Sequence, residues 1–286
     1  MNHFKTAFWL TLMTLLFLGA GRALGGQQGL MFATVFAVFA NGAAYFFSDK
    51  IVLAMYSARV VGPSEAPELH QLVSELASSA ALPMPRVAII DSPAPNAFAT
   101  GRNPSHAVVA VTTGLLGMLD RDELAGVIGH ELGHVQNRDI LISALAAVMA
   151  GAISHLASMA QWALIFGAGR SNDDEDSGGA GSIFLILLAP IAAMVVQMAV
   201  SRSREFLADA AGARISGRPM SLARALQKLE MMAQRVPMDA SPATAHLFIV
   251  NPLSGGGMLS LFSTHPSTQE RVEALQQLAM QTGSGR

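Results

Sequence analysis

The chain has 286 residues, enough for one or two domains, and 51% of them are hydrophobic while only 13% are charged. A typical soluble domain carries about 25% charged residues, so this composition and the mean hydropathy of +0.41 favour a membrane protein. The net charge of −2 gives no reason to expect nucleic-acid binding, and the absence of cysteine excludes disulfides and thiolate metal ligands.

Two apolar runs open the chain, at residues 7–21 and 23–48, and the second contains no charged residue. It reaches the roughly 20 residues that a transmembrane helix needs. The first run has the length and basic start of a cleaved signal peptide, but the small-residue cleavage pattern after it is unconvincing. We therefore expect two retained transmembrane helices within residues 1–48. The turn between them is expected at Gly25, Gly26 and Gly29.

A small sheet is expected within residues 49–139. Residues 67–82 predict an amphipathic helix that starts with a proline and carries leucine and valine on one face. Residues 86–91 predict a strand, and residues 96–101 and 106–113 predict a pair of strands joined by a turn. The sheet thus comes just before the most informative motif in the chain.

That motif is H-E-x-x-H at residues 130–134, in a helix that we expect over 120–139. Residues four apart lie one above the other on a helix, so His130 and His134 face the same way and can hold one metal ion. Glu131 lies beside the first histidine, where it can take a proton from a metal-bound water. The alternative is a surface helix that carries two histidines and a carboxylate.

The rest of this helix favours the metal site. Asp120 is a suitable N-cap, and an apolar stripe follows from Leu124 to Val135. Gly126, Gly129 and Gly133 each cost about 1 kcal/mol relative to alanine. Glycines at that cost indicate close packing, against either another helix or a substrate backbone.

A third ligand is expected further along the chain. The metzincin pattern would require a third histidine where this chain has Ile140, so that class is excluded. The other common solution takes a glutamate from a second helix, and Glu205 fits. Asp209, one turn later, can accept a hydrogen bond from the ring of a metal-bound histidine. Alternatively, both acids lie on the surface and pair with Arg202 or Arg204.

Residues 140–169 and 183–200 form two more apolar runs without a formal charge, separated by the acidic stretch 170–182. The motif precedes these runs and Glu205 follows them, yet their side chains have to meet at one metal ion. A single membrane crossing between them would put the ligands on opposite sides, so either both runs span the membrane or neither does. We expect a transmembrane hairpin over 140–200 with a short external acidic loop; a buried hairpin is the alternative. Basic residues are more frequent on the side of the metal motif, which puts that side in the cytoplasm.

The C-terminal part, residues 201–286, is expected to be largely helical. Helices are predicted at residues 218–235 and 267–280. Between them, residues 241–264 contain two prolines and three consecutive glycines, which favours a loop that moves over the cleft.

The pairing of HELGH (130–134) with SRSREFLADAAGA (201–213) resembles the HtpX family of bacterial inner-membrane zinc endopeptidases. The resemblance continues in PMPRVAIIDSPAPNAFATGR (83–102), VTTGLL (111–116) and THPSTQERVEAL (264–275). It implies one Zn²⁺ per chain, held by His130, His134 and Glu205, with Glu131 as the catalytic base. It also implies that His265 lies near the metal, where it hydrogen-bonds the developing oxyanion, and that Arg271 ties the last helix to the core.

The resemblance further implies a role in protein quality control and stress response, with cleavage of damaged or misassembled membrane proteins at the cytoplasmic face of the inner membrane. The expected partners are unfolded polypeptides and the lipid bilayer, without nucleic acid; the oligomeric state stays open. An extended substrate can add itself to the edge of the expected sheet as a further strand. That edge is expected at Asn96, Ala97, Phe98, Ala99 and Thr100.

We thus expect an α+β, mostly helical, zincin-like domain of the gluzincin type with a small β-sheet. The domain is formed by residues 49–139 and 201–286, and it is anchored by four hydrophobic helices. Two alternatives stay open: a processing protease for prenylated (CAAX) proteins, which share the motifs but have more membrane spans, and a non-enzymatic membrane chaperone that keeps zinc as a structural element.

Overall fold

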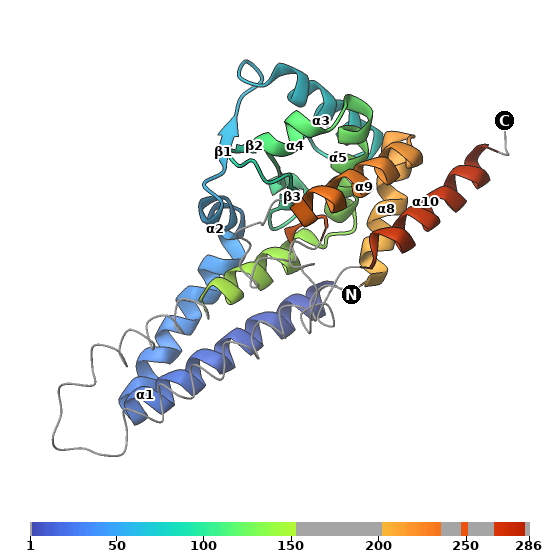
Figure 1. The fold of residues 1–286 in the computed structure, drawn as a ribbon. Coiled ribbons are helices and arrows are strands. Elements are labelled where there is room, and N and C mark those ends of the chain that lie inside the picture. The colour runs from blue at the N-terminus through green and yellow to red at the C-terminus, as the bar shows by residue number, and fades with distance from the viewer. Residues whose placement is uncertain (1, 153–201, 236–246, 251–265, 284–286) are drawn as a thin grey trace.

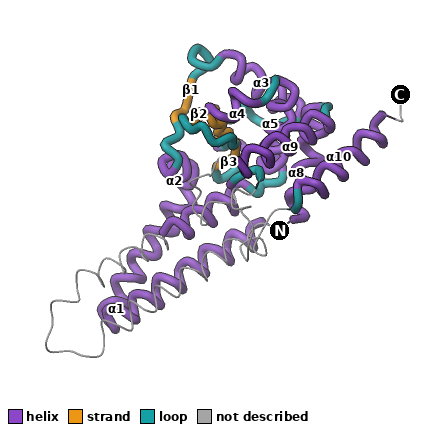
Figure 2. Tube along the Cα trace, viewed as in Figure 1, coloured by secondary structure: helices purple, strands orange, loops and turns teal. Residues whose placement is uncertain are grey.

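The computed structural model of the chain describes residues 2–152, 202–235, 247–250 and 266–283 (Figure 1). In these residues, helices surround one small sheet, and the helices of residues 2–46 and 140–152 project from one side (Figure 2). Of the hairpin expected over 140–200, only residues 140–152 are described. The rest of it, including the acidic stretch, lies outside the described residues. The observed class is a mostly helical domain with a small mixed sheet, as expected.

Residues 2–46 form a helical hairpin. Helix α1 (Asn2–Phe46) is interrupted at Gly25 and Gly26, and Gly26 has a φ of +56° that favours glycine. The two halves pack closely, because a Cβ on Gly29 would lie 2.1 Å from the carbonyl oxygen of Gly21. Gly29 therefore lies after the turn and allows the two halves of the hairpin to pack closely, whereas Gly25 and Gly26 form the turn itself. Among the described helices, Gly25–Phe46 has the length and apolar composition to cross a membrane, and Thr6–Arg22 is shorter.

The sheet has four strands in the order β1-β2-β4-β3. Strands β2 (Arg86–Ile90) and β4 (Val108–Thr112) run parallel, whereas β1 (Arg59–Val61) and β3 (Ala97–Thr100) pair antiparallel at the two edges. The expected sheet is confirmed. Strand β1 was not expected, because its three residues are too few to show a strand pattern in the sequence. Strand β3 is an edge strand, as the substrate hypothesis requires.

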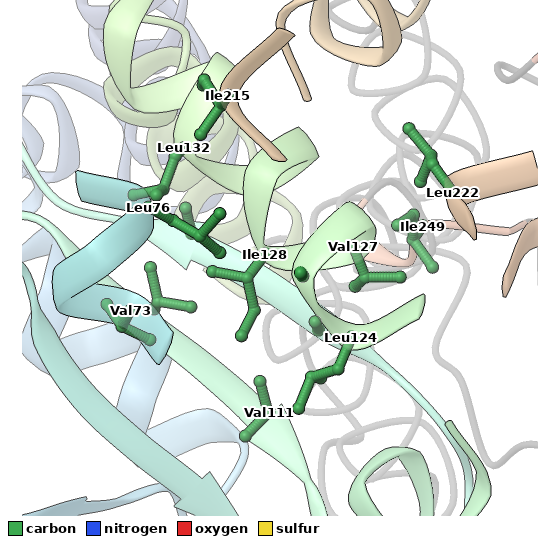
Figure 3. Packing of buried hydrophobic residues seen from close by; sticks show 14 of the residues in the cluster. Val73, Leu76, Val111, Leu124, Val127, Ile128, Leu132, Ile215, Leu222 and Ile249 are labelled. Carbon is green, nitrogen blue, oxygen red and sulfur yellow. The ribbon is translucent and has the colours of Figure 1, made fainter. Parts of the chain in front are cut away.

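Helices cover both faces of the sheet. On one face, α3 (Pro67–Ser79) and α5 (Arg121–Gln136) pack on side chains such as Val111, as Figure 3 shows for Val73, Leu76 and Ile128. On the other face, α2 (Ser48–Met55) and the apolar helix Ile140–Ala152 pack on alternate residues of the same strands. Strands buried on both faces are apolar throughout, which explains the absence of polar alternation in β4.

Helix α5 begins with a capping box. The Asp120 carboxylate accepts the N–H of Glu123, and the Glu123 carboxylate accepts the N–H of Asp120. The helix ends at Gln136 rather than at residue 139 as expected, because Arg138 has a φ of +59° in a turn. That turn separates α5 from the apolar helix Ile140–Ala152.

In the described residues of the C-terminal part, three helices complete the domain: α8 (Arg202–Ser216), α9 (Pro219–Arg235) and α10 (Thr268–Gly283). Helices α5 and α8 pack closely, since a Cβ on Gly129 would lie 2.9 Å from the carbonyl oxygen of Gly212. The other two glycines of α5 face Leu222 of α9 and Ala208 of α8. The glycines of α5 therefore serve helix packing, which decides between the two alternatives stated for them.

We expect Gly212→Ala to destabilise the protein by about 1–3 kcal/mol, because the added methyl group would lie 2.6 Å from the backbone nitrogen of His130. Gly117→Ala on α4 (Thr113–Met118) is the matched control, since no atom lies within 4 Å of its added carbon. That change should be neutral or stabilise by up to about 1 kcal/mol. Thermal unfolding of the detergent-solubilised protein measures both; equal melting temperatures for the two variants would contradict the packing argument.

Candidate metal centre

Three donor side chains from two helices meet beside the sheet. His130 and His134 come from α5 and Glu205 comes from α8, and their ligand atoms all lie within 4.8 Å of one another. The Nε2 atoms of the two histidines are 3.2 Å apart, and the Glu205 carboxylate oxygens lie 3.7 and 3.6 Å from them. Tetrahedral zinc with bonds of 2.0–2.2 Å separates its ligand atoms by about 3.3–3.6 Å. The donor set therefore fits one zinc ion.

The group lies inside the protein, at a small cavity of about 40 Å³. His130 is 1% exposed and Glu205 4%, so neither belongs to a surface helix or a surface ion pair. The cavity has room for an ion and a water molecule. The surface-helix alternative for the motif and the surface-acid alternative for Glu205 are therefore wrong.

A buried chain of hydrogen bonds orients the first histidine. Nδ1 of His130 donates to Asp209 Oδ1 at 2.8 Å, which leaves the Nε2 lone pair facing the other donors. Arg271 of α10 donates to both Asp209 oxygens at 2.7 Å. Burial would raise the pKa of Asp209, but the Arg271 guanidinium outweighs it and holds that pKa below the usual range. Arg271, only 1% exposed, thus connects the last helix to the metal group.

Glu131 lies next to the donors but points to the sheet. Its Oε2 accepts the backbone N–H of Ala99 at 2.8 Å, and Ala99 belongs to the edge strand β3. The N–H of Ala99 therefore points away from the neighbouring strand β4. Burial raises the pKa of Glu131, although the nearby His130 opposes it. The carboxylate thus bridges the edge strand and the metal group.

The second histidine has a different environment. Its Nδ1 lies 3.8 Å from Asp139, which also lies 3.7 Å from Arg204. Burial would lower the pKa of His134, but Asp139 and the Glu205 carboxylate raise it to about 9. Metal binding therefore has to displace a proton from this ring at neutral pH. The role of Asp139 was missed, because in the sequence it only marks the end of a helix.

A short segment, Leu247–Ile249, also lines the cavity and was missed as a part of the site. Asn96 holds it: its Oδ1 accepts the N–H of Ile249 at 3.3 Å, and its Nδ2 lies 3.5 Å from the carbonyl oxygen of Leu247. Arg271 donates to the carbonyl oxygen of Ile249 at 2.7 Å. The segment lies in the stretch expected to be a loop over the cleft, and most of that stretch, like His265, is outside the described residues.

Comparison with known proteins agrees with this geometry. The model of "Peptidase family M48" matches residues 63–279. A "Protease HtpX homolog" of Syntrophobacter fumaroxidans is 55% identical over 280 residues, covering 97% of this chain and 99% of that protein. One of Aquifex aeolicus is 52% identical over 272 residues, covering 94% and 90%.

The crystal structure of S. mikatae Ste24p has a similar fold, with a TM-score of 0.51 at 19% identity. The match covers 93% of this chain but only 62% of Ste24p. At that identity the likeness concerns the fold alone.

The donor group and the family match define a zinc metallopeptidase, and the chain belongs to peptidase family M48. Within that family it is an HtpX-type protease, with relatives of more than half identity along nearly the whole chain. The apolar helices and this relationship make it a membrane protein. The expected family, enzyme class and cofactor are thereby confirmed.

We expect Asp209→Asn to weaken zinc binding by about 10- to 100-fold, because the amide orients His130 less firmly than the carboxylate. Asp122→Asn is the control: this residue lies on α5 but pairs with the exposed Arg218. Glu205→Ala, which removes a donor, should cost more than either. Competition with a chromophoric chelator measures the three affinities, and wild-type affinity in Asp209→Asn would rule out the orienting role.

Proposed function

We propose that this protease is an endopeptidase for unfolded segments of membrane proteins, acting at the cytoplasmic face of the bacterial inner membrane in protein quality control under stress. The observation that carries the proposal is the hydrogen bond from Ala99 to Glu131, which joins the edge of the sheet to the metal group. An edge strand and a general base beside zinc are what hydrolysis of an extended chain requires.

We assign the roles in peptide hydrolysis as follows. Bound by His130, His134 and Glu205, zinc supplies a Lewis acid and lowers the pKa of water towards about 7. Glu131 takes the proton of the attacking water and delivers it to the leaving amine. Asp209 keeps His130 in the tautomer that leaves Nε2 free for the metal. His265 is proposed as a hydrogen-bond donor to the developing oxyanion, and its position lies outside the described residues.

Substrates are proposed to bind as an added strand along β3, at Asn96 to Thr100. Main-chain hydrogen bonds carry such binding and demand little of the substrate's sequence, so broad specificity follows. The substrate has to be extended over several residues, which restricts cleavage to unfolded segments. Asn96 connects this edge with Leu247–Ile249, so this segment is proposed to form the opposite wall of the substrate cleft.

Apolar helices next to the domain support membrane proteins as substrates. The apolar helix Ile140–Ala152 starts four residues after α5 ends, and it packs against Trp9 and Met13 of α1. Figure 1 shows this helix beside the projecting α1 hairpin, with the catalytic domain at one end. We propose that residues 140–200 form a membrane hairpin, so that disordered loops of membrane proteins reach the site laterally.

Two alternatives differ in what they would cleave or bind. A processing protease for prenylated proteins would cleave a prenylated peptide in preference to a misfolded membrane protein. A zinc-dependent chaperone would hold its metal in a closed site of four protein ligands. Within the described residues the metal group has three donors, which leaves a position open and supports the enzyme.

Glu131→Gln keeps the size of the side chain and removes the base. We expect zinc to stay bound while casein digestion falls by at least about 100-fold, since general-base catalysis contributes 10²–10⁴-fold. Glu75→Gln, on an exposed carboxylate of α3, is the control and should digest casein normally. Digestion at the wild-type rate by Glu131→Gln with stoichiometric zinc would exclude the proposed mechanism.

The topology predicts accessibility in intact cells. A cysteine at Ser177, in the acidic stretch, should react with a membrane-impermeant thiol reagent from outside. A cysteine at Ser64, an exposed residue after β1, should react only after lysis. The chain has no natural cysteine, so each variant has a single label site. Labelling of position 64 in intact cells, or of position 177 only after lysis, would refute the orientation and the lateral-access proposal.

A further inference from the structure

A second cavity, of about 350 Å³, lies where the apolar half of α1 ends. Its walls come from three places in the chain: the junction between α1 and α2, the loop before β2, and the turn between β3 and β4. The volume is at the lower end of the range for small-molecule sites, about 300–1,000 Å³. The cavity shares no residue with the metal centre.

The charged residues that line this cavity are mostly cationic: Lys50, Arg86 and Arg102, with one carboxylate, Asp49. Asp49 forms an ion pair with Arg86. Among the described residues, neither Lys50 nor Arg102 has a carboxylate partner. Two positive charges are therefore available to an anionic ligand.

Aromatic rings hold these two charges in place. The Lys50 ammonium lies 5.3 Å from the centre of the Phe47 ring, and the Arg102 guanidinium lies 5.6 Å from that of Phe46. Arg102 also donates through Nη2 to Nε2 of His106 at 2.8 Å. Nδ1 of that ring in turn lies 2.8 Å from Asn103 Oδ1. Arg102 keeps other N–H groups for a ligand.

The rim of the cavity is apolar and exposed. Phe46 is 56% exposed, Phe47 50%, and Met84, in the loop before β2, 45%. Phe46 is also the last residue of the apolar helix Gly25–Phe46. In Figure 1 this end of α1 meets α2 directly below the catalytic domain. With α1 in a bilayer, the cavity lies at the level of the lipid headgroups, and its rim faces the outer part of the acyl chains.

We propose that this cavity, which we call the headgroup cavity, binds the phosphate headgroup of an anionic phospholipid. A guanidinium and an ammonium suit a phosphodiester in charge and hydrogen bonding, and the exposed rings suit the glycerol and acyl parts of the same lipid. A zwitterionic lipid would bring its own cation against the free charges. The bound lipid would connect α1, α2 and the β3–β4 turn, which continues from the substrate-binding edge.

This inference rests on the placement of α1 in the bilayer, but not on peptide hydrolysis or on the cytoplasmic orientation. The test is native mass spectrometry of the full chain in detergent, titrated with phosphatidylglycerol or phosphatidylcholine. Each basic side chain near a lipid headgroup contributes roughly 5-fold in affinity. We therefore expect phosphatidylglycerol to bind at least about 10-fold more tightly than phosphatidylcholine.

The double change Lys50→Gln and Arg102→Gln should weaken phosphatidylglycerol binding by about 25-fold and remove the preference. Arg22→Gln is the matched control: this cation lies at the other end of the α1 hairpin, bound to Gln27, and its loss should cost less than about 2-fold. Asp49→Asn removes the one carboxylate, so it should raise the affinity by about 5-fold, a gain that misfolding cannot produce.

Equal binding of the two lipids by the wild type would overturn the proposal. So would an unchanged preference in the double variant, an equal loss in Arg22→Gln, or a loss instead of a gain in Asp49→Asn. Casein digestion in detergent, measured on the same samples, should be unaffected by these changes. A failure of the proposed hydrolysis would thus be seen separately from a failure of lipid binding.

Discussion

The close packing of α8 on α5 is the contact on which the metal centre depends. The two histidines lie on one helix and the glutamate on the other, so the spacing of the donors follows from the distance between the two backbones. Gly129 and Gly212 set that distance, because a Cβ on either would meet the other helix at less than 3.0 Å. Glycine weakens each helix by about 1 kcal/mol relative to alanine, and the approach that it permits brings Glu205 to within 3.7 Å of both rings.

A third helix, α10, supplies the positive charge that stabilises the buried carboxylate beside the metal group. Arg271 neutralises Asp209, and Asp209 accepts the hydrogen bond of His130, so that α10 orients the first histidine through Asp209. A buried carboxylate without such a partner would be protonated or would destabilise the fold by several kcal/mol. The same guanidinium binds the carbonyl oxygen of Ile249, and the orientation of the first ligand is therefore coupled to the wall of the cavity.

The sheet lies between the helix of the metal centre and the apolar helices. One face packs on α5, which carries the metal ligands, and the other packs on α2 and the apolar helix Ile140–Ala152. Strand β3 offers its free edge to Glu131, and the turn that follows it leads to the headgroup cavity. The turn at the end of the proposed substrate edge thus borders the headgroup cavity, which is consistent with substrates that arrive from the membrane.

The sequence by itself determined the local features: the helix with its cap at Asp120, the two histidines one turn apart, the carboxylate of Glu131 beside them, and the apolar runs. These features follow from periodicity and from interactions within about five residues, which a sequence displays directly. Glu205 and Asp209 were reached by exclusion and by resemblance, and their burial and contacts came only from the structure. Tertiary structure alone decided that the glycines of α5 serve helix packing, that Ala99 binds Glu131, and that Asp139 and Ile249 border the site. Such contacts join residues that are far apart in the chain. They depend on backbone atoms and on how closely two elements pack, and these two properties leave no pattern of residue types in the sequence.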